Sequence, residues 1–311
     1  MRGWLRRGGY AARLAGDRAD LWPAGALAAL AYLGWLPLLV VVAEPRVEAL
    51  SYFGVSVVTA GAYPANVVAL AVALVGAILL LCLVAAGAEA ALLRMAAAPS
   101  PSPPPLRRMA LSGLAVFLVA ALPALAAAAA TVLALTAVAV DAFLAPGRAG
   151  VALRLAAAVW PYLAGLAVCV VLGQAFGAVA LRRALAVEPT TVTAALLSAA
   201  QELVRTPVAR FGVALAGWVS DAAVLLLSWA VLRVLWAPIA QELSAGGLAS
   251  AETLLLLVGF VAIWLALLLA AGAVHVAISA WWALELARTD SVQRAAAAPA
   301  PRPDPRGGTS T

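Results

Sequence analysis

The sequence contains no lysine, one histidine and two cysteines, and charged residues make up only 11% of its 311 residues. A single histidine and two distant cysteines, Cys82 and Cys169, cannot supply the usual ligand set of a protein-bound zinc ion. The patterns G-x-x-x-x-G-K-[ST] and G-x-G-x-x-G are also missing, which excludes the phosphate-binding loops that they form. We therefore expect no metal ion, no cofactor and no enzyme activity.

Apolar residues take the place of the missing charged ones. They form 66% of the chain, and the mean hydropathy is +1.04, whereas soluble domains contain about 45–50% apolar and about 25% charged residues. An integral membrane protein is therefore expected. The net charge of +6 comes from 20 arginines, which stand at the ends of apolar runs and form no stripe with interleaved aromatic residues, so we expect no binding to nucleic acid. The lack of lysine beside abundant alanine and arginine is typical of a GC-rich bacterial gene.

Six apolar runs are long enough to cross a bilayer. A hydrocarbon core about 30 Å thick needs about 20 helical residues at about 1.5 Å per residue. The chain is therefore predicted to be an all-α, polytopic integral membrane bundle of six transmembrane helices, forming one domain over 23–290. The predicted spans cover about residues 23–43, 67–89, 110–140, 155–181, 211–236 and 253–282. Pro123 and Pro161 fall inside the third and fourth runs and should kink those helices.

Two segments outside these runs have the periodicity of amphipathic helices. In residues 1–22 apolar and small side chains recur at helical spacing from Trp4 to Trp22, which indicates a helix at the membrane surface, with a frayed basic tail as the alternative. The second segment, residues 190–205, lies between the fourth and fifth spans, and its polar side includes Glu202. Its predicted apolar stripe consists of Val192, Leu196, Ala199, Ala200, Leu203 and Val204. Residues 291–311 lack apolar periodicity and are expected to form a disordered tail.

The arginines favour one orientation in the membrane. With six spans both termini lie on the same side, and sixteen of the 20 arginines fall on that side. The other four are Arg46, Arg148, Arg154 and Arg233. Cytoplasmic segments carry the excess of basic residues in membrane proteins. We therefore predict a multi-pass protein of the bacterial plasma membrane, with both termini and both amphipathic helices in the cytoplasm.

The second amphipathic segment carries a pattern of alanine, leucine, arginine and proline before a helix that starts with Phe-Gly. The matching residues are Ala194, Leu197, Ala200, Leu203, Arg205, Pro207, Phe211 and Gly212. In this pattern and in its topology the chain resembles uncharacterised bacterial six-helix membrane proteins, among them those similar to the membrane domain of glycerophosphoryl diester phosphodiesterases. The resemblance brings no catalytic residues, because in that group the phosphodiesterase chemistry belongs to a separate soluble domain.

Three polar side chains are predicted at membrane depth. Asp221 lies about 16 Å along the fifth span, where a carboxylate costs about 2.5–3.5 kcal/mol on insertion scales and should face the bundle interior. His275 and Gln174 lie about 9 Å and about 12 Å from the inner ends of their spans. We expect the three to converge, either as a site for a coupling proton or small solute, or as hydrogen bonds that hold the helices together. Glu89 is expected at the interface, beside Arg94.

Two classes of function fit this sequence. We favour a non-enzymatic membrane scaffold or accessory component, whose cytoplasmic amphipathic helices dock a protein partner. The alternative is a permease or permease subunit for a small solute, proton-coupled through Asp221, and it predicts a polar cavity that reaches this carboxylate. The run Ala126–Ala130 allows close helix packing within one bundle or between the chains of a homo-oligomer. In either case the lipid bilayer surrounds the spans.

Overall fold

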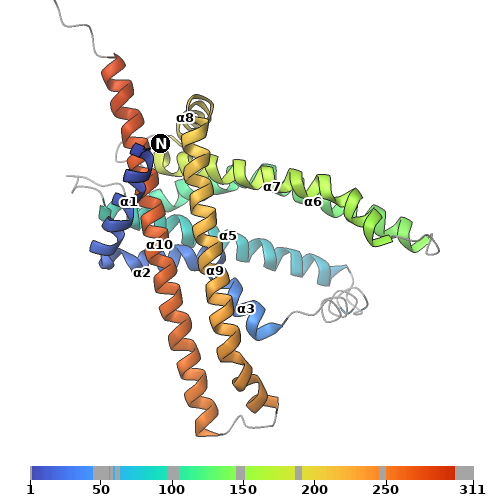
Figure 1. Ribbon diagram of the computed structural model, residues 1–311. Coiled ribbons are helices and arrows are strands. Elements are labelled where there is room, and N and C mark those ends of the chain that lie inside the picture. The colour runs from blue at the N-terminus through green and yellow to red at the C-terminus, as the bar shows by residue number, and fades with distance from the viewer. Residues whose placement is uncertain are drawn as a thin grey trace, which may run out of the picture.

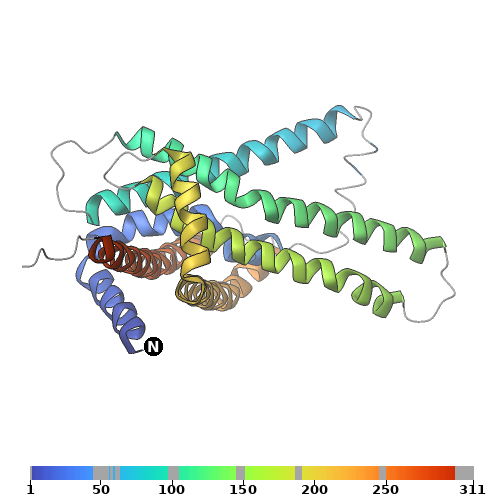
Figure 2. The ribbon, with the colours of Figure 1, turned by 90° about the horizontal axis from the view of Figure 1, so that it is seen from above.

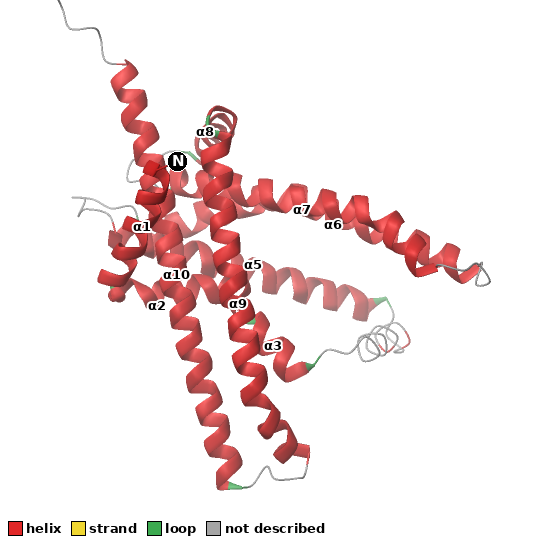
Figure 3. Ribbon diagram, in the orientation of Figure 1, coloured by secondary structure: helices red, strands yellow, loops and turns green. Residues whose placement is uncertain are grey.

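The computed structural model describes residues 2–44, 56, 59, 64–96, 105–144, 151–185, 191–244 and 250–297. Every regular element in these ranges is a helix (Figure 3), which confirms the prediction of an all-α fold. The proline-rich linker after the second predicted span lies outside the described residues, apart from its last few positions, and so do residues 298–311 of the predicted tail.

Among the described residues, five helices are long and apolar enough to cross a membrane. They are α5 (Ala65–Ala96), α6 (Leu106–Leu144), α7 (Val151–Ala184), α9 (Pro207–Ser244) and α10 (Ala251–Ala297). They cover the second to sixth predicted spans, so the chain has the architecture of a multi-pass membrane protein. Helix α10 continues past Ser291, the predicted start of the tail, because the alanines that follow are the strongest helix formers.

The first predicted span is divided between two helices. Helix α2 (Trp22–Ala29) continues as the π-helical turn η2 (Leu30–Gly34), and α3 (Leu36–Ala43) follows after a bend of 51°. Pro37 explains the break, because proline lacks the N–H that would bond the carbonyl four residues earlier, and its ring clashes with that carbonyl. The described residues therefore hold five spans, or six if this bent pair crosses the membrane as one.

The arginine-bearing ends of the long helices meet in one place. The C-terminal ends of α5 and α7, the C-terminal half of α10 and the N-terminal ends of α6 and α9 gather near α2, α1 (Arg2–Asp17) and α8 (Val192–Arg205) (Figure 1). The last turns of α10 project beyond this region (Figure 1). We call this region the hub. Away from it α6 and α7 run side by side, α9 and α10 form a second pair, and the two pairs point in different directions (Figure 2).

Burial is concentrated in the hub. Its core takes buried residues from six helices, α5 to α10, including Ala90, Val116, Val179, Val213 and Trp282. By contrast, the most apolar stretch of α5 has 0% of its residues buried. A helix that is hydrophobic all round needs an apolar environment. The outer parts of the long helices therefore present the surface that lipid covers in a membrane protein.

Helix α2 crosses α10 at two glycines. A Cβ added at Gly25 would lie 2.3 Å from the carbonyl oxygen of Gly272, and one added at Gly272 would lie 2.4 Å from the backbone nitrogen of Ala26. No side chain fits at these distances, and small residues are what allow the backbones of membrane helices to approach so closely. This crossing fixes the first predicted span against the sixth.

Both amphipathic segments are helical and pack against the long helices. In α1, Ala11 and Ala15 are buried, and the ring of Trp4 lies 4.5 Å from that of Trp281 on α10, centroid to centroid. Thr191 caps the N-terminus of α8, and its Oγ1 accepts a hydrogen bond of 3.2 Å from the backbone N–H of Ala194. This is the usual way in which a threonine caps a helix N-terminus.

Candidate functional site

A buried polar network joins α5 to α10. Glu89, which is 3% exposed, lies near the hub end of α5. Its Oε1 lies 2.8 Å from Nε2 of His275, and its Oε2 accepts a hydrogen bond of 3.0 Å from the hydroxyl of Ser279. His275 and Ser279 stand one helical turn apart on α10, so both side chains reach the same carboxylate. A buried carboxylate needs such partners, because desolvation without them costs several kcal/mol.

Arg182 of α7 completes this network. Its guanidinium donates hydrogen bonds of 2.9 Å to the Ser279 hydroxyl and 3.0 Å to the carbonyl of Ala178, and it lies 4.0 Å from the Glu89 carboxylate. The guanidinium carbon also lies 5.8 Å from the ring centre of Trp282, within cation–π range. Ser279 thus accepts from the arginine and donates to the glutamate. We call Glu89, Arg182, His275 and Ser279 the Glu89 network; it ties α5, α7 and α10 together.

A second buried cluster holds α8 in place. The carboxylate of Glu202 on α8 accepts hydrogen bonds from Arg183 on α7 and from Arg210 on α9; the Arg183 Nε bond is 2.8 Å and the Arg210 bond is 2.9 Å. Glu202 is 4% exposed and Arg210 is 1% exposed. We call these three residues the Glu202 cluster. Because a buried charge needs compensation, a displacement of α8 would remove the Glu202 carboxylate from Arg210.

A third ion pair attaches α1. The Nε of Arg7 donates a hydrogen bond of 2.6 Å to the carboxylate of Glu285 on α10, and Glu285 is buried. Beside this pair, Gly8 lies against the Trp281 ring, which an added Cβ would approach to 3.1 Å. The apolar face of α1 thus contacts protein in the hub.

The structure corrects the predicted faces of α8. Ala195, Ala199 and Glu202 form its buried face, whereas Ala200 and Val204 of the predicted apolar stripe are exposed. The error arises because α8 carries small or apolar side chains on two sides, so periodicity alone does not select the inward one. Glu202 lies three residues after Ala199, on the same side of the helix, and its partners come from α7 and α9.

The three residues predicted to converge are found in different environments. His275 is half-buried and contacts Glu89. Asp221 is exposed on α9 but close enough to His275 for their charges to interact. Gln174 is exposed on α7, and among the described residues it takes no part in the Glu89 network. The structure therefore places His275 near Asp221. His275 pairs with Glu89, and Gln174 lies elsewhere on α7.

Glu89 differs most from its expected place. The sequence predicts an interfacial carboxylate beside Arg94, and the structure buries it against α10. Glu89 and Arg182 both lie on the hub side, within about two turns of the arginine-rich helix ends. The position of Glu89 near the basic end of its helix could be predicted from the sequence. Its partners on α7 and α10 could not be predicted, because they depend on how α5, α7 and α10 pack.

The chemistry available in the Glu89 network is proton exchange and charge compensation. His275 and Glu89 are at hydrogen-bond distance, so a proton can pass between them. Among the described residues, no three side chains of His, Cys, Asp or Glu lie together as metal ligands. A cavity of about 20 Å³ between α9 and α10 has room for about one water molecule, and Asp221 does not line it.

Comparison of the chain with family models, with curated proteins and with solved structures finds no match. The resemblance to six-helix membrane proteins of the glycerophosphoryl diester phosphodiesterase membrane-domain group therefore stays a prediction from the second amphipathic segment.

Proposed function

We propose that the chain is a non-enzymatic scaffold or accessory component of the bacterial plasma membrane, which presents α1 and α8 to a cytoplasmic protein partner. The observation that carries this proposal is the attachment of both amphipathic helices to the long helices through buried charge. Arg7 pairs with Glu285, and Glu202 joins α8 to α7 and α9. A helix held in this way keeps its outward face in a fixed orientation, which lowers the entropic cost of binding a partner.

The outward face of α8 has the composition of a docking surface. Leu197 is 67% exposed, Val204 is 83% exposed and Val208, at the start of α9, is 86% exposed. The spacing of seven residues places Leu197 and Val204 on one side of α8. Apolar side chains that line up on an exposed helix face mark interaction sites more often than single exposed ones do. The arginine excess on the hub side supports placing this face in the cytoplasm.

Site-specific photo-crosslinking in cells tests this proposal. A photoreactive amino acid at Leu197 or Val204 should give protein adducts that shift the chain on a denaturing gel. The same residue at Val219 on α9, which is 62% exposed within a candidate span, serves as the control and should give lipid adducts only. Lipid adducts alone at all three positions would refute a protein-docking role for α8.

A proton-coupled permease is the second candidate, and one observation favours it. Asp221 is exposed on α9, within electrostatic range of His275. Tyr32 lies 5.7 Å from the His275 ring, centroid to centroid. Ionisable groups at membrane depth mark proton pathways in transporters. Proton flux into liposomes, followed with an internal pH dye, should be lost in Asp221→Asn if this second function holds, and wild-type protein without flux would contradict it.

A further inference from the structure

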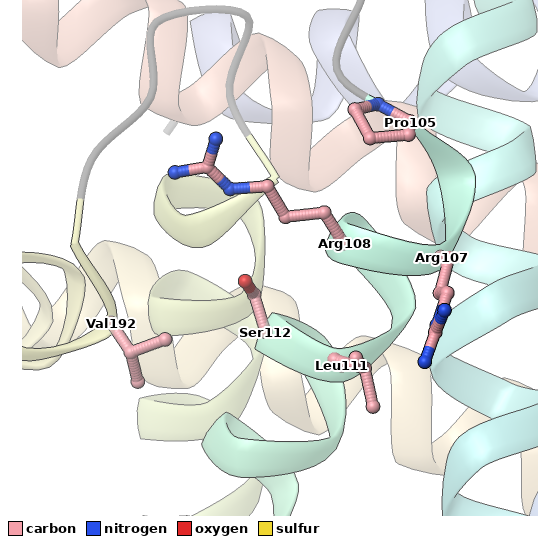
Figure 4. Close-up of a pocket in the computed structure, with 6 residues that line it drawn as sticks. All are labelled: Pro105, Arg107, Arg108, Leu111, Ser112 and Val192. Atoms are coloured by element: carbon pink, nitrogen blue, oxygen red, sulfur yellow. The ribbon is translucent and has the colours of Figure 1, made fainter.

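A cavity of about 470 Å³ opens at the edge of the hub, apart from the Glu89 network and the Glu202 cluster (Figure 4). Its lining consists of Pro105, Arg107, Arg108, Leu111, Ser112 and Val192. The α6 residues come from the first two turns of that helix, and Val192 is the first residue of α8. In Figure 4 the Ser112 side chain lies between those of Arg108 and Val192. The cavity thus combines cationic, hydroxyl and apolar groups.

Among the described residues, the positive charge at this cavity has no protein counter-ion. Arg107 and Arg108 are exposed, and among the described residues no carboxylate lies within ion-pair distance of either. They also occupy the first turn of α6, where the helix dipole is itself positive and disfavours cations. The N-terminus of α8 adds a second positive helix end at Val192. A bound anion would offset the charge of the arginines and the positive ends of both helix dipoles. The Ser112 hydroxyl can donate a hydrogen bond to this anion.

An apolar stripe leads away from the same cavity along α6. Leu111, Leu118, Leu122 and Leu125 are spaced by seven, four and three residues, which places them on one side of the helix. They are 50%, 42%, 60% and 60% exposed. Arg107 precedes Leu111 by four residues and therefore stands at the hub end of the same stripe. The surface of α6 thus has a positively charged end at the hub and an apolar stripe along which an acyl chain can lie.

We propose that this cavity binds the phosphate headgroup of an anionic phospholipid, with Arg108 and Ser112 as the phosphate ligands and the leucine stripe of α6 against an acyl chain. The Arg107 side chain leaves α6 on another side than Arg108 (Figure 4), so it adds positive charge at the hub end of the stripe. Arginine suits this role because its planar guanidinium donates paired hydrogen bonds to phosphate oxygens. Basic pockets between membrane helices on the cytoplasmic side are known to hold anionic headgroups. The bound lipid would neutralise the start of α6 and hold it beside α8.

Native mass spectrometry of the purified full-length protein tests this site, with dioleoyl phosphatidylglycerol and dioleoyl phosphatidylcholine as probes. Wild type should bind the anionic lipid more tightly than the zwitterionic one. The Arg107→Gln/Arg108→Gln variant should bind phosphatidylglycerol about thirtyfold more weakly, since each arginine near an anionic lipid contributes a factor of about five. Both side chains are exposed, so the variant should melt at the wild-type temperature, which a thermal scan checks.

Matched controls separate the alternatives. Arg6→Gln/Arg205→Gln removes the same charge from exposed positions on α1 and α8 and should leave lipid binding unchanged; equal weakening by both charge pairs would refute a defined site. Leu118→Ser should weaken the lipid but not an inorganic phosphate probe. Inorganic phosphate that displaces phosphatidylglycerol, with no effect of Leu118→Ser, would overturn the lipid assignment in favour of a soluble anion. Equal binding of the two lipids would overturn the proposal altogether.

Discussion

Replacing Glu202 by alanine is expected to destabilise the hub by about 3–5 kcal/mol, the range for breaking a buried ion pair by removing one partner. Glu202 compensates two arginines. Arg183, whose side chain is 22% exposed, can turn toward solvent, whereas the Arg210 side chain is 1% exposed and cannot. The loss of stability therefore arises mainly from the buried charge of Arg210. The replacement also releases α8, because the carboxylate joins that helix to both α7 and α9.

Thermal unfolding in detergent, followed by tryptophan fluorescence or circular dichroism, measures this effect. We expect the midpoint to fall by about 10 °C, at a few degrees per kcal/mol for a chain of this size. Gln201→Ala is the matched control, since Gln201 is the exposed neighbour of Glu202 on α8. The double variant Glu202→Leu/Arg210→Met should recover most of the loss, because an apolar pair of similar volume can replace a buried ion pair. Equal melting temperatures for Glu202→Ala and Gln201→Ala would refute a stabilising role for the Glu202 carboxylate.

Three further changes probe other parts of the hub by the same thermal scan. Glu89→Ala should cost about 3–5 kcal/mol, because it leaves a buried arginine without its carboxylate; a loss below about 1 kcal/mol would show that the Glu89 network is not needed for stability. Gly272→Val should prevent α2 from packing on α10, whereas Gly259→Val, with nothing within 4 Å of its added Cβ, should behave as wild type. Thr191→Ala should cost about 1 kcal/mol by removing the cap of α8, and no change would mean that the cap is dispensable.

Hydropathy was sufficient to predict the class of fold. The apolar runs are so long and so poor in charge that five of the six predicted spans coincide with long helices. The first predicted span is not one continuous helix, although the sequence shows Pro37 within it. Proline is compatible with a kinked membrane helix, so its presence alone does not reveal a bend of 51° between α2 and α3.

The buried charges were harder to predict, for a physical reason. Each pairing joins different helices, such as Glu89 with His275, 186 residues apart. Helical periodicity reports which side of one helix is apolar, and it carries no information on which other helix that side meets. For Asp221 the insertion cost predicts an interior position, and the structure exposes the carboxylate while keeping it near His275. The sequence alone therefore identifies some residues of the candidate site, but not the residues with which they pair.

A cytoplasmic docking role requires α8 to lie on the cytoplasmic side of the membrane, and this can be measured. In a Cys82→Ala/Cys169→Ala background, single cysteines at Leu197 on α8 and at Ala251 at the start of α10 can be labelled with a membrane-impermeant maleimide, in intact spheroplasts and in inverted vesicles. Both positions are exposed. We predict that the Leu197→Cys variant is labelled only in inverted vesicles and the Ala251→Cys variant only in spheroplasts. Labelling of the Leu197→Cys variant from outside would contradict a cytoplasmic hub and the docking role proposed for it.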